Sequence, residues 1–134
     1  MLSSADVVAY LQAQGITAPI HCQLDIPDYP DMPDEICVVE LSPSLTPTYE
    51  QAFDRPVVRM TVRGRQSNPD SAEALMDAVD RAFMDNSPPP WIEIGGRHVT
   101  NIQQFAGPGF LGLEDVSGRR PLFSATYVIE LARD

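Results

Sequence analysis

The chain has 134 residues and a mass of 14.7 kDa, and its hydrophobic share of 43% predicts a single globular domain spanning residues 1–134. Its net charge of −10 at pH 7 argues against general affinity for nucleic acid, because such binding depends on Lys and Arg side chains that neutralise phosphates. The apolar runs are too short to cross a bilayer and the N-terminus lacks the pattern of a secretory leader, so we expect a soluble protein.

The first third of the chain predicts a short helix followed by two strands. Residues 4–14 have apolar side chains at helical spacing, with Ser3 or Ser4 as the N-cap and Gly15 as the stop. We expect strands at 20–25 and 36–41, separated by a turn-rich segment over 27–34.

Two cysteines, Cys22 and Cys37, are too few for a disulfide scaffold, and their spacing is not that of a metal or redox site. We expect buried thiols. If the two cysteines lie on neighbouring strands, oxidation could link them where the geometry permits.

Residues 42–55 contain two prolines and no sustained periodicity, which predicts a long loop or arm. Leu45, Tyr49 and Phe53 recur at intervals of four residues, so a short amphipathic helix packed on a partner is the alternative.

The next segment, 57–65, alternates in the manner of a strand with one buried face. Val58, Met60 and Val62 share the face that we expect in the core, whereas Arg59, Thr61, Arg63 and Arg65 share the face that we expect in solvent. The row formed by Arg59, Arg63 and Arg65 is either a solvated face with local salt bridges or a basic contact surface for the acidic side of an adjacent subunit.

The strongest helix signal begins at Pro69, with an apolar stripe that comprises Ala72, Leu75, Met76, Val79, Ala82 and Phe83, and ends at 86–90. A β-hairpin follows, with strands at 91–94 and 97–105 around Gly95 and Gly96. A glycine-rich connection over 107–120 leads to a long final strand at 122–131. This order predicts an α+β fold, a largely antiparallel (mixed) β-sheet with two helices packed on one face.

No residue pattern indicates catalysis, a cofactor or a metal. The carboxylates between 25 and 35 lack the spacing of a calcium loop, which favours a solvated acidic turn that faces a basic partner. His21 and Cys22 are neighbours on a strand and point to opposite faces, and no motif recruits His98. Residues 107–112 lack the Lys-Ser/Thr ending of a phosphate loop, so Phe110 and Leu111 are expected to dock on the domain itself or on a neighbour.

Four motifs, taken in order, resemble a known family. They are RPVVRMTVRGR over 55–65, the helix DSAEALMDAVDRAFMD, IGGRHVTNI, and GPGFLGLEDVSGRRPLFSATYVI. Together they are similar to the siphophage tail terminators, the minor capsid or head-tail joining proteins of tailed bacteriophages. The match covers about residues 36–131, and the spacing around Asp115 departs from the family pattern.

The resemblance implies a structural virion protein at the head-tail junction that assembles in the host cytoplasm as a ring, expected to be a hexamer. Such a ring caps the tail tube, stops polymerisation of the tube protein, contacts a head-side connector, and lets DNA pass without sequence-specific binding. Two rival classes stay open: another connector component, such as a head-completion or stopper protein, and a small enzyme or ligand-binding domain. An apolar pocket with convergent polar groups would favour the latter.

Overall fold

The computed structural model describes residues 2–42, 53–85, 93–114 and 119–132. Its first helix, α1 (Ser4–Ala13), begins at a capping box in which the Ser3 hydroxyl accepts from the Asp6 amide and the Asp6 carboxylate accepts from the Ser3 amide. The helix ends before Gly15, whose φ of 93° requires the conformational freedom of glycine. The predicted N-cap and stop are confirmed.

The second helix, α2 (Pro69–Met84), has the predicted buried stripe of Ala72, Met76, Val79, Ala82 and Phe83, with Leu75 partly buried beside it. Close packing brings its first turn against Gly64, where a Cβ atom would lie 2.6 Å from both the backbone nitrogen and the Cβ of Ala72. A residue larger than glycine therefore does not fit at the end of the preceding strand.

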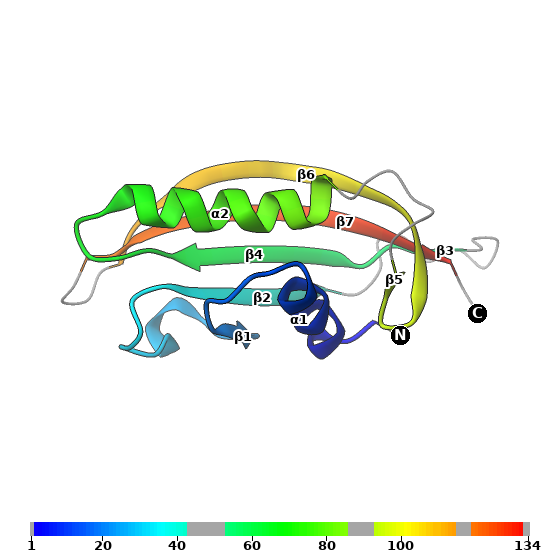
Figure 1. Ribbon diagram of the computed structural model, residues 1–134, viewed down its shortest axis with the longest axis horizontal. Coiled ribbons are helices and arrows are strands. Elements are labelled where there is room, and N and C mark those ends of the chain that lie inside the picture. The colour runs from blue at the N-terminus through cyan, green and yellow to red at the C-terminus, as the bar shows by residue number, and fades with distance from the viewer. Residues whose placement is uncertain (1, 43–52, 86–92, 115–118, 133–134) are drawn as a thin grey trace.

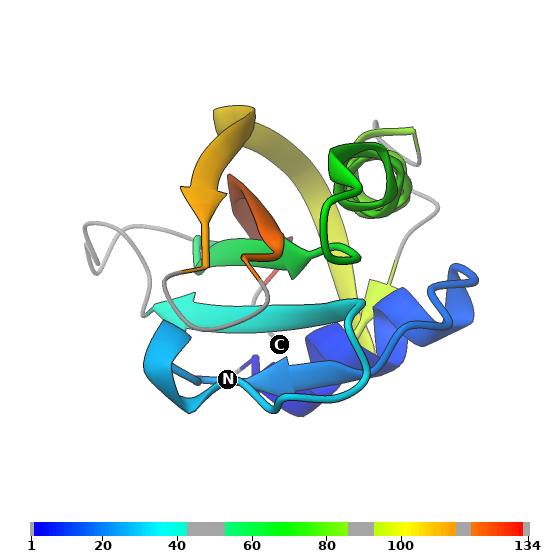
Figure 2. The ribbon, with the colours of Figure 1, turned by 90° about the vertical axis from the view of Figure 1, so that its left-hand side faces the viewer.

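Seven strands form one mixed sheet with the order β1-β2-β4-β7-β6-β5, and β3 pairs with the end of β7. Their bounds are β1 (Ile20–Cys22), β2 (Ile36–Ser42), β3 (Phe53–Asp54), β4 (Val57–Arg63), β5 (Glu93–Ile94), β6 (Arg97–Leu113) and β7 (Pro121–Ala132). Among these described strands, only β1 and β2 pair in parallel. Figures 1 and 2 show both helices on the same face of the curled sheet, so the predicted α+β fold is confirmed.

The sheet and the helices enclose a single core. Its members come from α1, α2 and the inward-facing residues of the strands, among them Val7, Leu11, Val39, Met60, Met76, Phe83, Tyr127 and Ile129. Two tyrosine hydroxyls join the layers, because Tyr10 donates to the Ala82 carbonyl at 2.5 Å and Tyr127 donates to the Asp80 carboxylate at 2.6 Å. Both bonds end on α2, which fixes that helix against α1 and the sheet.

Three strand ends differ from the sequence predictions by two residues or more. The first strand ends at Cys22 instead of residue 25, because Gln23 has a φ of 56° and turns the chain out of the sheet. The fourth ends at Arg63 instead of residue 65. The hairpin at Gly95 and Gly96 is confirmed, but β6 runs to Leu113 through residues 107–113, where a loop was predicted. Of four register shifts against β7, the three between Gln104 and Gly112 accommodate the glycines and Pro108 within that strand.

Candidate assembly surface

The face of the sheet opposite the helices carries a buried ionic cluster. Arg63 is fully buried, and its Nη1 atom donates to Glu114 at 3.0 Å. The other guanidinium nitrogens donate to the carbonyls of Asp34, Pro30 and Pro33 at 2.7–2.8 Å. Residues 30–34 belong to the connection between β1 and β2, so this connection covers the guanidinium and satisfies its donors.

A second arginine shares the same carboxylate. Arg120 approaches Glu114 at 2.7 Å and Asp34 at 3.1 Å, and the side chains of Arg120 and Glu114 are 5% and 2% exposed. It also donates to the carbonyl of Asp31. Burial alone would lower the pKa of Arg120, but the hydrogen bonds and charges of Glu114 and Asp34 outweigh burial and raise that pKa. Arg120 therefore stays charged, and its contacts with Glu114 and Asp34 hold both ends of the β6–β7 connection against residues 30–34.

This cluster corrects the prediction of a solvent-facing basic row. Thr61 and Arg63 are buried because the β1–β2 connection covers the face that alternation assigned to solvent. Arg63 is therefore not available to a partner. The two remaining members are exposed: Arg59 donates to the Ser124 hydroxyl at 3.3 Å, and Arg65 pairs with Glu35 at 2.9 Å.

Part of the predicted acidic turn pairs with an arginine of the same chain and not with a separate partner. Asp31 and Asp34 pair with Arg120, although the Asp31 side chain is 88% exposed. Asp25 and Asp28 are exposed, in line with a solvated turn. Among the residues that the structure describes, no group of His, Cys, Asp and Glu side chains could hold a metal ion.

The apolar surface of β6 stands out from the rest of the molecule. Four of its large side chains are exposed: Phe105 at 67%, Phe110 at 59%, Leu111 at 43% and Leu113 at 45%. Phe110 also packs edge-on against Phe123, with ring centroids 5.5 Å apart, so it contacts its own domain and solvent at once. The sequence singled out Phe110 and Leu111. It missed Phe105 and Leu113, although the absence of charge from residues 99–113 marks the whole segment.

The same strand forms one edge of the sheet. Its outer neighbour β5 pairs only with Arg97 and His98, so in the described part of the chain β6 has no strand partner on its outer side from Val99 onward. Exposed edges with apolar side chains are rare in monomers, because they invite pairing with another chain. This edge is the best candidate for a contact with another protein.

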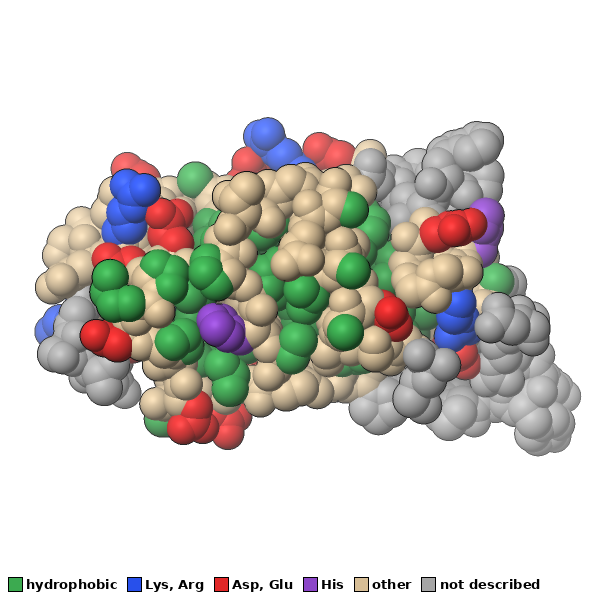
Figure 3. Space-filling view, turned by 60° about the horizontal axis from the view of Figure 1, so that its bottom comes forward, with side chains coloured by type: hydrophobic (Ala, Val, Ile, Leu, Met, Phe, Trp, Pro, Cys, Tyr) green, Lys and Arg blue, Asp and Glu red, His purple; other side chains and the backbone are tan. Residues whose placement is uncertain are grey.

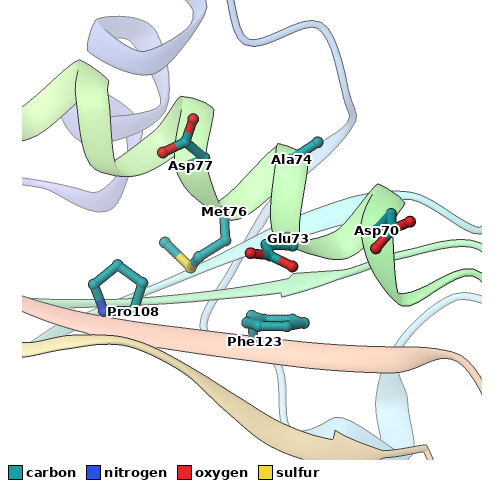
Figure 4. Close-up of a pocket in the computed structure, with 7 residues that line it drawn as sticks. All are labelled: Asp70, Glu73, Ala74, Met76, Asp77, Pro108 and Phe123. Carbon is teal, nitrogen blue, oxygen red and sulfur yellow. The ribbon is translucent and has the colours of Figure 1, made fainter.

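A groove of about 580 Å³ lies beside this edge, between α2 and the β6–β7 pair (Figure 4). Met76, Pro108 and Phe123 form its apolar floor, and Asp70, Glu73 and Asp77 contribute carboxylates. Asp77 is paired with Arg81 at 3.0 Å. The groove is open to solvent and its polar groups are all acidic, which suits a basic or apolar side chain of a partner.

The predicted arm lies mostly outside the described residues. Leu45 and Tyr49 belong to that part, as do Trp91 and Ile92 of the predicted hairpin. Phe53 is within β3, where it pairs with Ala132.

The cysteines lie on neighbouring strands, but they are not opposite each other: Ile20 faces Cys37, and Cys22 faces Val39. Both are free thiols. Cys37 is buried, and burial followed by the charge of Glu35 raises its pKa to about 12. Cys22 is exposed, which corrects the prediction that both thiols are buried.

No family model and no curated protein matches this sequence. Among solved structures, nineteen chains match. One of them, a protein of unnamed function, aligns over 100% of this chain and 99% of its own, with a TM-score of 0.55 and 15% sequence identity. At that identity the likeness shows the fold alone. No described helix has the length and apolar character needed to span a membrane.

Proposed function

We propose that the protein is a structural virion subunit, a tail terminator that forms a ring on the end of a phage tail tube. The observation that carries the proposal is the outer edge of β6, which has no strand partner beyond the hairpin among the described residues and exposes Phe105, Phe110, Leu111 and Leu113. A surface of this kind costs solubility in a monomer and is useful in a subunit that assembles.

The motifs behind the family resemblance coincide with the parts of the fold that hold this edge. Residues 108–119 include the end of β6, and Glu114 and Arg120, whose side chains are paired, flank the β6–β7 connection. Val62–Arg65 includes the buried Arg63 that binds the same carboxylate. In the proposed role, the ionic cluster keeps the apolar edge in a fixed place.

In the same proposal, the partners are further copies of the chain, the tail tube protein and a head-side connector. DNA passes through the ring without being held, because a protein of net charge −10 repels phosphates. A lumen lined mainly by arginine in a solved ring would overturn this last step.

Light scattering combined with negative-stain imaging of the purified protein tests the ring. We expect a species of about six times 14.7 kDa with a central hole. Deletion of the gene from its phage tests the role. Loss of a terminator gives over-long tails that are not attached to heads, whereas loss of a stopper protein leaves tails of normal length and heads that leak DNA.

A further inference from the structure

Two long segments of the sequence contain no charged residue. Residues 7–24 and 99–113 contain no Asp, Glu, Lys or Arg, and they are the two longest such runs in a chain that has 28 charged residues among 134, nine basic and nineteen acidic. Each run contains one edge of the sheet. The first holds β1 together with most of α1, and the second holds the part of β6 that has no outer strand partner among the described residues.

The surface over α1 and β1 is accordingly poor in charge. Ala9, Ala13, Pro19 and Cys22 are exposed on it, and Ile20 is partly buried. Figure 3 shows this face with hydrophobic and uncharged side chains across its middle, whereas acidic and basic side chains gather mainly around its rim. In the described part of the chain, β1 pairs only with β2, so its other side has no strand partner.

We propose that the β6 edge of one copy docks on the α1–β1 edge of the next copy. This inference rests on the proposed function and names the two surfaces that meet in the ring. The contact is heterologous, because the two edges differ in length and in side chains. Repeated head-to-tail contacts of this kind close into a ring when the rotation between copies permits it.

Charge argues that the occupant is a second copy of the chain. Two copies that each carry a net charge of −10 repel each other, and this repulsion is least opposed to a contact through surfaces that carry no charge. Natural proteins usually protect sheet edges with charged side chains, and both edges here lack them. A basic partner would instead be drawn to the acidic side chains, which belong to other segments, among them the α2 carboxylates of the groove.

The geometry of β6 sets the form of the contact. Register shifts and Pro108 interrupt the strand after Gln104, and the one regular stretch beyond the hairpin is the four residues from Asn101 to Gln104. The three residues of β1 match a short stretch of this length. The remaining contact is burial of the exposed β6 side chains against α1 and β1.

Two variants that each block one edge test the inference. The first carries Phe105→Asp and Leu111→Asp on β6, and the second carries Thr17→Asp and Cys22→Asp beside and on β1. All four positions are exposed, so each variant should keep the fold, which circular dichroism and thermal unfolding check. Gln66→Asp with Ala78→Asp, at exposed positions outside both charge-free segments, adds the same charge as a control.

Analytical ultracentrifugation of each variant and of their mixture gives the answer. We expect the wild type and the control to assemble, each edge variant to stay a monomer, and the 1:1 mixture to form a dimer of twice 14.7 kDa. The mixture dimerises because each variant retains the edge that the other lacks.

Three results would overturn the inference. If the wild-type protein stays monomeric at high concentration, a second copy does not bind the β6 edge, and a different protein must cover it. Dimers of the β1 variant alone indicate a two-fold contact between two β6 edges. If the β6 variant still assembles, the β6 edge is not part of the contact between copies. The deletion phenotype tests the proposed function separately. If the variants confirm the edge contact but deletion gives tails of normal length, the terminator role is rejected. If deletion gives over-long tails but the protein stays strictly monomeric, the edge contact is rejected.

Discussion

At the scale of single residues, the most consequential feature is the carboxylate of Glu114 between two arginines. Arg63 and Arg120 bring two positive charges into a site where their side chains are 0% and 5% exposed. Removing charges from water costs several kcal/mol per ion, and this cost is offset only while the opposite charge and the hydrogen bonds remain. The cluster is therefore more important for holding Glu114 and Arg120 against residues 30–34 than for net stability.

The substitution Glu114→Gln should lower the free energy of unfolding by about 3–5 kcal/mol, because it leaves two buried guanidinium groups without their shared anion. Glu35→Gln removes the partner of Arg65 in an exposed pair and should cost less than about 1 kcal/mol. Urea unfolding followed by circular dichroism measures both. Equal losses in the two variants would mean that the cluster is not closed to solvent.

The two cysteines should differ in reactivity. A thiol reagent at pH 8 should label Cys22 at once and Cys37 only after unfolding, because Cys37 is buried and its raised pKa of about 12 keeps the thiol protonated. The free energy of unfolding should also fall as the pH rises from about 9 towards about 12, since the unfolded thiol ionises first, near its ordinary value of 9.0. Cys37→Ser is the control. Rapid native labelling of two thiols per chain would contradict the buried position.

At the scale of elements, the sequence predicted the helices and strands that depend on residues nearby in the chain. It did not predict the features that depend on a segment distant in the sequence. The caps of α1, the stripe of α2, the Gly95-Gly96 hairpin and the last strand follow from local periodicity and backbone preference. Alternation also placed Arg63 correctly on the face opposite Met60. It could not show that residues 30–34 cover that face, because this depends on a crossover between β1 and β2.

The candidate site was partly predictable for the same reason. Phe110 and Leu111 were recognisable as apolar residues in a glycine-rich segment, but glycines and Pro108 indicated a loop. Pairing with β7 overrides these local preferences, because ten residue pairs join the two strands despite the register shifts. The edge position of β6 was not predictable, since strand order is a property of the whole sheet.

The attachment of α2 gives a test at this scale. Tyr127→Phe should lower the free energy of unfolding by about 1.5–3 kcal/mol, because its hydroxyl donates to the Asp80 carboxylate. Tyr10→Phe should cost about 0.5–1.5 kcal/mol, because its hydroxyl donates to an uncharged carbonyl. Urea midpoints of the two variants check the order, and a larger loss for Tyr10→Phe would contradict it.

At the scale of the whole molecule, the distribution of charge should govern assembly. The chain is acidic, but its nineteen acidic and nine basic residues avoid both edge segments, and the exposed Arg59 and Arg65 lie outside them. Two kinds of contact are thus conceivable: one through the uncharged edges, and one in which these arginines meet acidic surface on a neighbour. The two respond to salt in opposite directions, because salt screens repulsion between the copies as well as attraction between unlike patches.

We therefore expect the average mass of the wild-type protein to rise when NaCl increases from about 0.01 M to about 1 M, a change that shortens the Debye length from about 30 Å to about 3 Å. Screening removes the repulsion between copies of net charge −10 and leaves the apolar contact intact. Sedimentation velocity at matched protein concentrations measures the change. Arg59→Gln should assemble with the same trend, and the Phe105→Asp and Leu111→Asp variant should stay a monomer throughout. A mass that falls with salt, and falls less in Arg59→Gln, would instead assign the contact to the arginines.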